Sequence, residues 1–196
     1  MTDGTEAFGR ALDGFEAVLR ELTETQWTLP TPCDPWTVRD VVGHVIGGVE
    51  WAAALITGSG TVDTLRADGF SDPGTLAGAV PLEAWASGRA QLSAAVETTE
   101  EDKLLSWPFG EQTVDTGLEW FSLEILVHTW DVGTATGHQV RLDPVLVHGH
   151  LIRLRPVSRY LRGAGAYGPE LVPPAGADEQ AQLIAFLGRR GLPGET

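Results

Sequence analysis

Apolar residues recur every three or four positions along most of the chain, which predicts a protein built almost entirely of α-helices. Residues 5–22 show the pattern most clearly, because charged residues fill the positions between the apolar ones. The same spacing predicts helices over residues 37–56, 81–97, 116–136 and 144–162, and a short last helix over 178–190. Segments rich in proline and glycine separate them, at 28–35, 57–80 and 163–178.

One segment departs from this periodicity. Residues 104–114, LLSWPFGEQTV, contain residues that favour β-strands on both sides of a Phe-Gly pair, which indicates a short hairpin. The pattern as a whole predicts an all-α fold, with a four-helix bundle over residues 1–140 and a C-terminal helical extension over residues 141–196 packed on it.

The second predicted helix begins with strong signals and then contains residues that disfavour a helix. Thr37 is a good N-cap, and Asp40 three positions later completes a variant of the capping box. The middle of this helix holds His44, Gly47 and Gly48, and each glycine costs about 1 kcal/mol relative to alanine. Two adjacent glycines indicate that another helix or a ligand approaches this backbone closely.

Composition and charge narrow the possible functions. The net charge of −14, with no cluster of lysine and arginine, disfavours binding to nucleic acid or to an anionic membrane. The sequence contains no run of 18 apolar residues, and its acidic N-terminus lacks an apolar signal core, so we expect a cytoplasmic protein. A single cysteine cannot form an internal disulfide, which agrees with a reducing compartment.

The candidate chemistry lies on the fourth predicted helix. Glu124 and His128 are four residues apart and therefore share one face of a helix that is apolar almost all round. Burying a carboxylate and an imidazole without partners is costly. His44 raises the same problem on the second helix, beside the apolar stripe of Val41 and Val45.

One divalent metal held by His44, Glu124 and His128 satisfies both observations. Two imidazole nitrogens and one carboxylate oxygen are typical of open catalytic zinc sites, and the same ligands suit nickel or iron(II). Asp131, one turn beyond His128, is placed to orient that ring. A buried polar network without a metal is the alternative interpretation of the same three residues.

The other polar residues have simpler interpretations. Cys33 is interpreted as a small buried residue at a loop–helix junction, with a role as fourth ligand or redox group left open. Trp36 and Trp130 are interpreted as core anchors. We expect the remaining histidines on the surface or in loops: His138, His148 and His150. We expect the arginines of the fifth helix to form a solvated face, although they could instead meet an anionic substrate: Arg153, Arg155, Arg159 and Arg162.

Two motifs together resemble a known family. TPCDPWTVRDVVGHVIGG at 31–48 is similar to the P-T-P-C-x-x-W-T-V-R-D-L-x-x-H opening of DinB-like bundle proteins typical of actinobacteria. LEILVHTWDVGTATG at 123–137 resembles the E-x-x-x-H-x-W-D-x-A-x-A-T-G signature of that group, and LIAFLGRR at 183–190 resembles its closing motif. The group includes the N-terminal domain of mycothiol-dependent maleylpyruvate isomerase.

The resemblance implies a DinB-like bundle with a divalent metal between its second and fourth helices. The family's three ligands correspond to His44, Glu124 and His128 of this sequence. In the isomerase, the metal assists chemistry on a low-molecular-weight thiol of the mycothiol or bacillithiol type. This chain lacks most of the separate C-terminal domain of the isomerase, so residues of that domain have no counterpart here.

The leading hypothesis is an enzyme that uses a divalent metal, zinc first, and a mycothiol-like thiol for isomerisation of a small electrophile or thiol transfer to it. The first rival is a module that binds or senses a metal or ligand without turnover. The second rival is the metal-free polar network. The expected partner is a small-molecule substrate, and a homodimer is compatible with a bundle of this kind.

Overall fold

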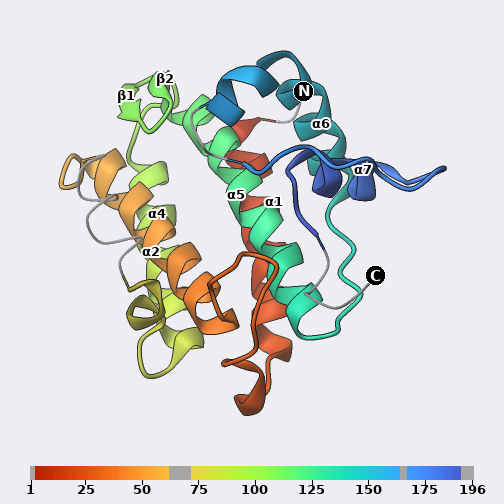
Figure 1. Cartoon of the computed structure of the whole chain (residues 1–196). Helices are drawn as coiled ribbons and strands as arrows, with labels where there is room; N and C mark the ends of the chain where they lie inside the picture. Colours follow the sequence, from red (N-terminus) through yellow and green to blue (C-terminus); the bar gives the residue numbers. More distant parts are fainter. Residues whose placement is uncertain (1–2, 62–71, 164–166, 191–196) are drawn as a thin grey trace.

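Four long helices form a bundle in the computed structural model, which describes residues 3–61, 72–163 and 167–190 (Figure 1). The bundle helices are α1 (Gly4–Glu21), α2 (Val38–Thr57), α4 (Pro81–Glu97) and α5 (Val114–Ala135). Short 3₁₀ helices, η1 (Glu24–Gln26) and η2 (Pro73–Ala77), lie in the connections. The predicted loop over 57–80 thus contains η2, while residues 62–71 lie outside the described residues.

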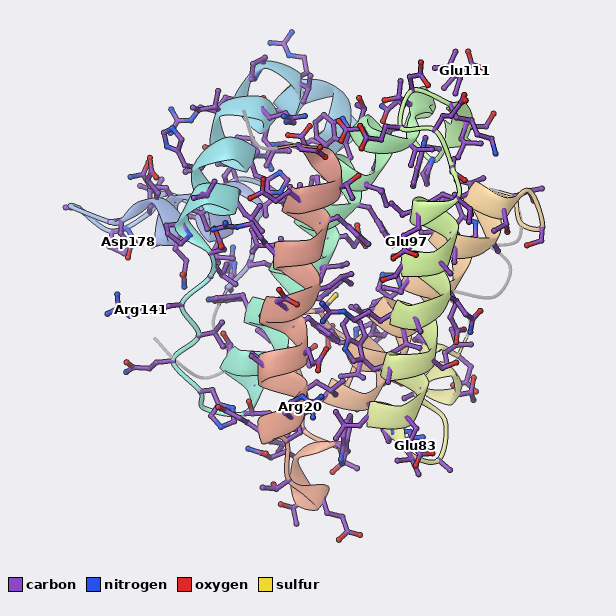
Figure 2. The ribbon with its side chains drawn as sticks, turned by 180° about the vertical axis from the view of Figure 1, so that it is seen from behind. Arg20, Glu83, Glu97, Glu111, Arg141 and Asp178 are labelled. Carbon is purple, nitrogen blue, oxygen red and sulfur yellow. The ribbon has the colours of Figure 1, made fainter. Side chains whose placement is uncertain are left out.

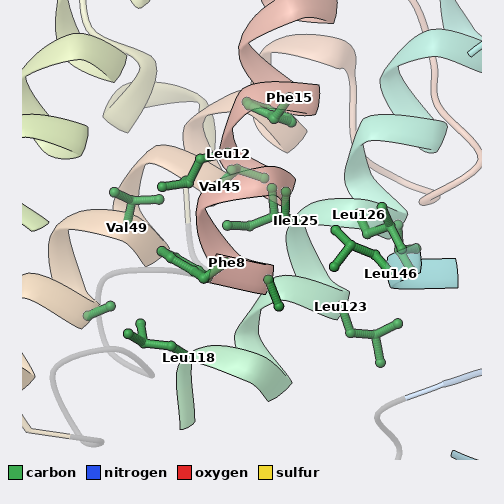
Figure 3. Close-up of a cluster of buried hydrophobic side chains, with 14 of the residues drawn as sticks. Phe8, Leu12, Phe15, Val45, Val49, Leu118, Leu123, Ile125, Leu126 and Leu146 are labelled. Atoms are coloured by element: carbon green, nitrogen blue, oxygen red, sulfur yellow. The ribbon is translucent and has the colours of Figure 1, made fainter. Parts of the chain in front are cut away.

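The bundle closes around an apolar core that all four helices share. Helix α1 packs along α5, and α2 lies between α5 and α4. The ring of Phe15 on α1 lies 5.1 Å from that of Trp85 on α4, so α1 and α4 also contact each other and the four helices enclose the core. Figure 3 shows apolar side chains of α1, α2 and α5 meeting in this core, among them Leu12, Val45 and Ile125.

The glycines of α2 allow neighbouring elements to approach its backbone. A Cβ atom on Gly47 would lie 2.5 Å from the Leu76 side chain of η2, and one on Gly48 would lie 2.7 Å from the Phe121 ring of α5. Gly43 is tighter still, since a Cβ there would lie 1.9 Å from the carbonyl oxygen of Pro73. Protein elements, rather than a ligand, therefore explain the two glycines that the sequence singled out.

The hairpin and the C-terminal extension complete the fold. Strands β1 (Leu104–Trp107) and β2 (Gly110–Thr113) pair in antiparallel register, so the predicted hairpin is confirmed. Helix α6 (Pro144–Gly163) and helix α7 (Glu179–Phe186) pack on each other, and Gln180 joins them to the bundle by donating to the carbonyl oxygen of Val140. The division into 1–140 and 141–196 stays a prediction.

Helix boundaries follow the capping residues. Thr37 accepts a hydrogen bond from the Asp40 backbone, as the capping box predicted, and Gly58 ends α2 in the left-handed conformation with φ 83°. Helix α5 begins earlier than the predicted Thr116, because the Thr113 side chain caps it by accepting from the Thr116 backbone. The last helix ends at Phe186, short of the predicted 190.

Helix α2 is long and apolar enough to cross a bilayer, and it is the one such helix among the described residues. The mean hydropathy of its most apolar window is 1.2. Of that window, 72% is buried inside the protein. This burial is what a core helix of a bundle shows, and it follows from contacts with α4, α5 and η2.

Candidate metal centre

The three predicted ligands converge between α2 and α5. His44 lies two turns into α2, and Glu124 and His128 lie one turn apart on α5. Both rings are buried, whereas 39% of the Glu124 side chain is exposed. Solvent therefore reaches this cluster from the side of the carboxylate.

The distances suit a single ion. His44 Nε2 lies 3.1 Å from Glu124 Oε1, and His128 Nε2 lies 3.6 Å from the same oxygen. One donor atom of each residue lies within 4.8 Å of the other two. Donors that bind zinc at about 2.0–2.1 Å in a tetrahedron lie about 3.3 Å from one another. The donor set and its spacing therefore fit a divalent metal with a further position open for another ligand.

Asp131 holds His128 in the orientation that such a site needs. His128 Nδ1 donates to Asp131 Oδ2 at 3.0 Å, because a carboxylate can only accept. This bond places the proton of a neutral ring on Nδ1 and leaves the Nε2 lone pair facing Glu124. Asp131 is fully buried, as the predicted orienting role requires.

Arg189 neutralises the buried Asp131 from the other end of the chain. Its Nε lies 3.2 Å from Asp131 Oδ1, and its Nη2 donates to Oδ2 at 3.2 Å. The residue follows α7, so the C-terminal extension reaches the back of the candidate centre. Sequence reasoning did not assign Arg189, because nothing in helical periodicity pairs two residues 58 positions apart.

Electrostatic interactions between its side chains tie the cluster together. Burial alone would raise the pKa of Glu124, but the adjacent rings of His128 and His44 hold that pKa well below its usual range. Burial alone would lower the pKa of His128, but Asp131 and Glu124 raise it to about 9. A metal at Nε2 must displace that proton, so metal affinity is expected to increase with pH.

The connector before α2 places an aromatic ring and a thiol beside the candidate centre. The Trp36 ring lies 4.8 Å from that of His44 and 6.3 Å from that of His128. Cys33 lies at the loop–helix junction, as expected, but is only half-buried, and its Sγ lies 3.8 Å from Arg189 Nη2. Cys33, His128 and Asp131 form a second, overlapping group of donors. Burial raises the pKa of the Cys33 thiol to about 11, which disfavours the thiolate at neutral pH.

A model of the mycothiol maleylpyruvate isomerase N-terminal domain family matches residues 8–133, a stretch that contains the whole cluster. The chain belongs to this family. Two mycobacterial relatives match it almost end to end. They are "Uncharacterized protein MT0763" of Mycobacterium tuberculosis (strain CDC 1551 / Oshkosh) and "Uncharacterized protein Rv0738" of the same species (strain ATCC 25618 / H37Rv). Each is 33% identical over 193 residues, which cover 95% of this chain and 98% of the relative.

A solved member of this family has a similar fold. The crystal structure of a histidine-to-alanine mutant of the mycothiol-dependent maleylpyruvate isomerase superposes with a TM-score of 0.52 at 16% identity. The match covers 68% of this chain and 64% of that one, so this chain spans less than two thirds of the isomerase. The likeness confirms the DinB-like bundle and says nothing by itself about activity.

The other histidines divide between surface and core. His148 is exposed on α6 and pairs with Glu179, and His138 lies partly exposed in the loop after α5, as expected. The prediction for His150 was wrong, because its ring is buried and its Nε2 lies 3.0 Å from Ser122 Oγ on α5. His150 lies in the middle of the buried stripe of α6, which consists of Leu146, Val147, Leu151 and Leu154.

The arginines of α6 do not form one solvated face. Arg155 and Arg159 are exposed, as expected. Arg153 instead turns toward α5 and pairs with Glu119, and Arg162 donates to the carbonyl oxygen of Phe186 on α7. Trp36 and Trp130 both pack against the core, but Trp36 also borders the candidate centre.

Proposed function

We propose that this protein is a divalent-metal enzyme that uses a low-molecular-weight thiol of the mycothiol type to isomerise a small electrophile or to transfer the thiol to it. One observation carries the proposal: His44, Glu124 and His128 meet, with donor spacing suited to one metal, in a chain of the mycothiol maleylpyruvate isomerase N-terminal domain family. Zinc is the first choice of metal, and nickel and iron(II) bind the same donors.

A metal in this position would act as a Lewis acid that favours the thiolate form of a bound thiol. The chain's own residues do the rest. His44, Glu124 and His128 provide the donors, and Asp131 keeps Nε2 of His128 turned toward the cluster. Trp36 excludes water from one side, while the exposed side of Glu124 leaves an entrance.

An external thiol suits this site better than Cys33 does. Burial keeps Cys33 in the thiol form, and its Sγ lies beside Arg189 and Asp131, behind His128. A cofactor thiol that enters on the Glu124 side would approach the open position directly. The proposal therefore assigns no catalytic step to the cysteine of the chain.

A second candidate function is binding or sensing of a metal or ligand without turnover. It is supported by the same three donors, because holding a metal requires no further catalytic group. The metal-free alternative is also supported by one contact, since His44 Nε2 and Glu124 Oε1 lie 3.1 Å apart, at hydrogen-bond distance.

The test is an activity assay with two electrophiles. Metal-loaded protein is incubated with mycothiol together with maleylpyruvate or with a generic electrophile such as monobromobimane. Isomerisation regenerates the thiol and is followed as loss of maleylpyruvate, whereas thiol transfer is followed as loss of free thiol. We expect one of these rates to exceed the uncatalysed rate and to be lost on chelation and in His44→Ala. His148→Ala is the matched control, because it removes an exposed histidine far from the cluster and should retain full activity.

The outcomes separate the three hypotheses. Metal bound at one equivalent with no turnover of any electrophile would support the binding module and contradict the enzyme. Turnover that is the same in His44→Ala as in the wild type would contradict a role for this centre. Protein that takes up no metal under any loading condition would leave the hydrogen-bonded network as the remaining explanation.

A further inference from the structure

Charge is unevenly distributed between the two parts of the chain. Residues 141–196 contain 7 of the 13 basic residues but only 5 of the 27 acidic ones. The bundle is therefore strongly acidic, while the extension that packs on it is slightly basic. Such asymmetry concerns association rather than fold, because opposite charges on two surfaces steer them together.

The basic and acidic regions lie side by side at one end of the molecule. Helix α6 crosses the end of the bundle from which the β1–β2 hairpin projects (Figure 1). Trp120 of α5 joins the two, since its ring lies 6.5 Å from that of Phe109 in the hairpin and 5.8 Å from the guanidinium carbon of Arg153 on α6. Phe109, Trp120 and Arg153 thus form one continuous surface.

The outward face of α6 is partly apolar as well as basic. Val145, Ile152 and Arg159 lie at intervals of seven residues and therefore share this face, with Arg155 beside them. Ile152 is 61% exposed and Val145 is 46% exposed. Arg159 forms no ion pair or hydrogen bond with any described residue, and the one contact of Arg155 is a long hydrogen bond of 3.5 Å to Gln182.

The hairpin side carries the opposite charge and its own exposed apolar residues. The acidic residues of this side are all exposed, and Figure 2 shows Glu111 at its tip: Glu100, Glu101, Asp102 and Glu111. Leu104 is 58% exposed and Phe109 is 38% exposed. Four of the seven large exposed hydrophobic residues within the described chain thus belong to the hairpin and α6.

We propose that this end of the molecule, the α6–hairpin surface (Leu104, Phe109, Glu111, Ile152, Arg155 and Arg159 with the acidic turn at 100–102), pairs with the same surface of a second copy of the chain. A surface that carries both charges next to each other complements itself after a two-fold rotation. In that arrangement α6 of each copy faces the acidic hairpin of the other. A uniformly basic or uniformly acidic partner would match only half of the surface and would repel the other half.

The proposal is tested by sedimentation equilibrium on the full chain over a dilution series. We expect the wild type to approach twice the 21.0 kDa of one chain as concentration rises. The double variant Arg155→Glu/Arg159→Glu and the double variant Glu100→Arg/Glu101→Arg should each remain monomeric. Mixing the two variants should restore a dimer of one copy of each, because one contact then pairs the two reversed charges and the other keeps the wild-type pair.

The control is Arg20→Glu/Arg141→Glu, which changes the net charge equally at positions away from the surface (Figure 2). It should dimerise like the wild type. A wild type that stays at 21.0 kDa up to its solubility limit would overturn the proposal. A dimer that survives the Arg155→Glu/Arg159→Glu substitutions would also overturn it, because the contact would then lie elsewhere. All six substituted positions are exposed, and helical circular dichroism checks that each variant is folded.

Discussion

At the scale of single residues, Asp131 links the candidate metal centre to the rest of the fold. It accepts a hydrogen bond from His128 on one side and from Arg189 on the other, and it is fully buried. A buried carboxylate of this kind fixes the orientation of a ligand ring and raises its basicity. The metal affinity of the protein should therefore depend on a residue that does not bind the metal.

Asp131→Asn tests this dependence. The amide keeps the shape of the side chain but loses the charge that pairs with Arg189 and with the His128 ring. We expect metal affinity to fall by about 10–100-fold, measured by competition with a chromophoric chelator. Asp143→Asn is the control, because Asp143 is partly buried and likewise pairs with an arginine, Arg10, at 2.6 Å outside the centre. Equal affinities in the two variants would contradict the role of Asp131.

Sequence reasoning identified the donors of the candidate centre but not their surroundings. His44, Glu124 and His128 could be predicted because each is a polar residue on a strongly apolar helix, where periodicity fixes the face. Arg189 could not, because it follows a short helix and its position relative to Asp131 depends on how the extension packs. His150 was predicted on the surface or in a loop, although the apolar residues around it on α6 indicate that it lies on the buried face.

At the scale of elements, His150 makes the packing of α6 on α5 sensitive to acid. Burial, together with the nearby charge of Arg153, lowers its pKa to about 4. In the unfolded chain the same imidazole takes up a proton below about pH 6.5. The unfolded state then binds more protons than the folded state, so stability decreases as pH falls from about 6.5 and this loss ends near 4.

The expected loss between about pH 7 and about pH 5 is about 2 kcal/mol of unfolding free energy from this residue. Urea unfolding of the wild type and of His150→Gln at both pH values measures it. The variant should lose less stability on acidification than the wild type does. His148→Gln, an exposed neighbour on the same helix, should lose as much as the wild type. An identical loss in His150→Gln would contradict the account of the buried ring.

The close packing of η2 on α2 requires a glycine at position 43, which the sequence analysis did not identify. In Gly43→Ala the new Cβ would lie 1.9 Å from the Pro73 carbonyl oxygen, and backbone cannot move as easily as a side-chain tip. We expect destabilisation by about 1–3 kcal/mol, because the two elements must separate. The free energy of unfolding in urea provides the measurement.

Gly14→Ala is the matched comparison within α1. Nothing lies within 4 Å of the Cβ that it would add. Alanine is the better helix former, so this variant should gain about 0.5–1 kcal/mol. Stabilisation of both variants, or an equal loss in both, would show that contact with η2 does not explain the glycine at 43.

At the scale of the whole molecule, the sequence predicted the architecture well because each long helix carries its own periodicity and caps. The DinB-like bundle, the hairpin and the C-terminal helices are confirmed. The two helix ends that were misjudged, at Thr113 and Phe186, depend on a cap and on tertiary packing rather than on the apolar pattern. The route by which the extension returns to Asp131 depends on contacts that no local pattern encodes.

The account as a whole depends on a metal shared by α2 and α5. The most direct measurement is the metal content of untagged protein, determined by elemental mass spectrometry for the wild type, His44→Ala, His128→Ala and Cys33→Ala. We predict one equivalent in the wild type and in Cys33→Ala, and a marked loss in both histidine variants. One equivalent retained in both histidine variants would contradict the account, and loss in Cys33→Ala with retention in His44→Ala would place the ion in the other group of donors.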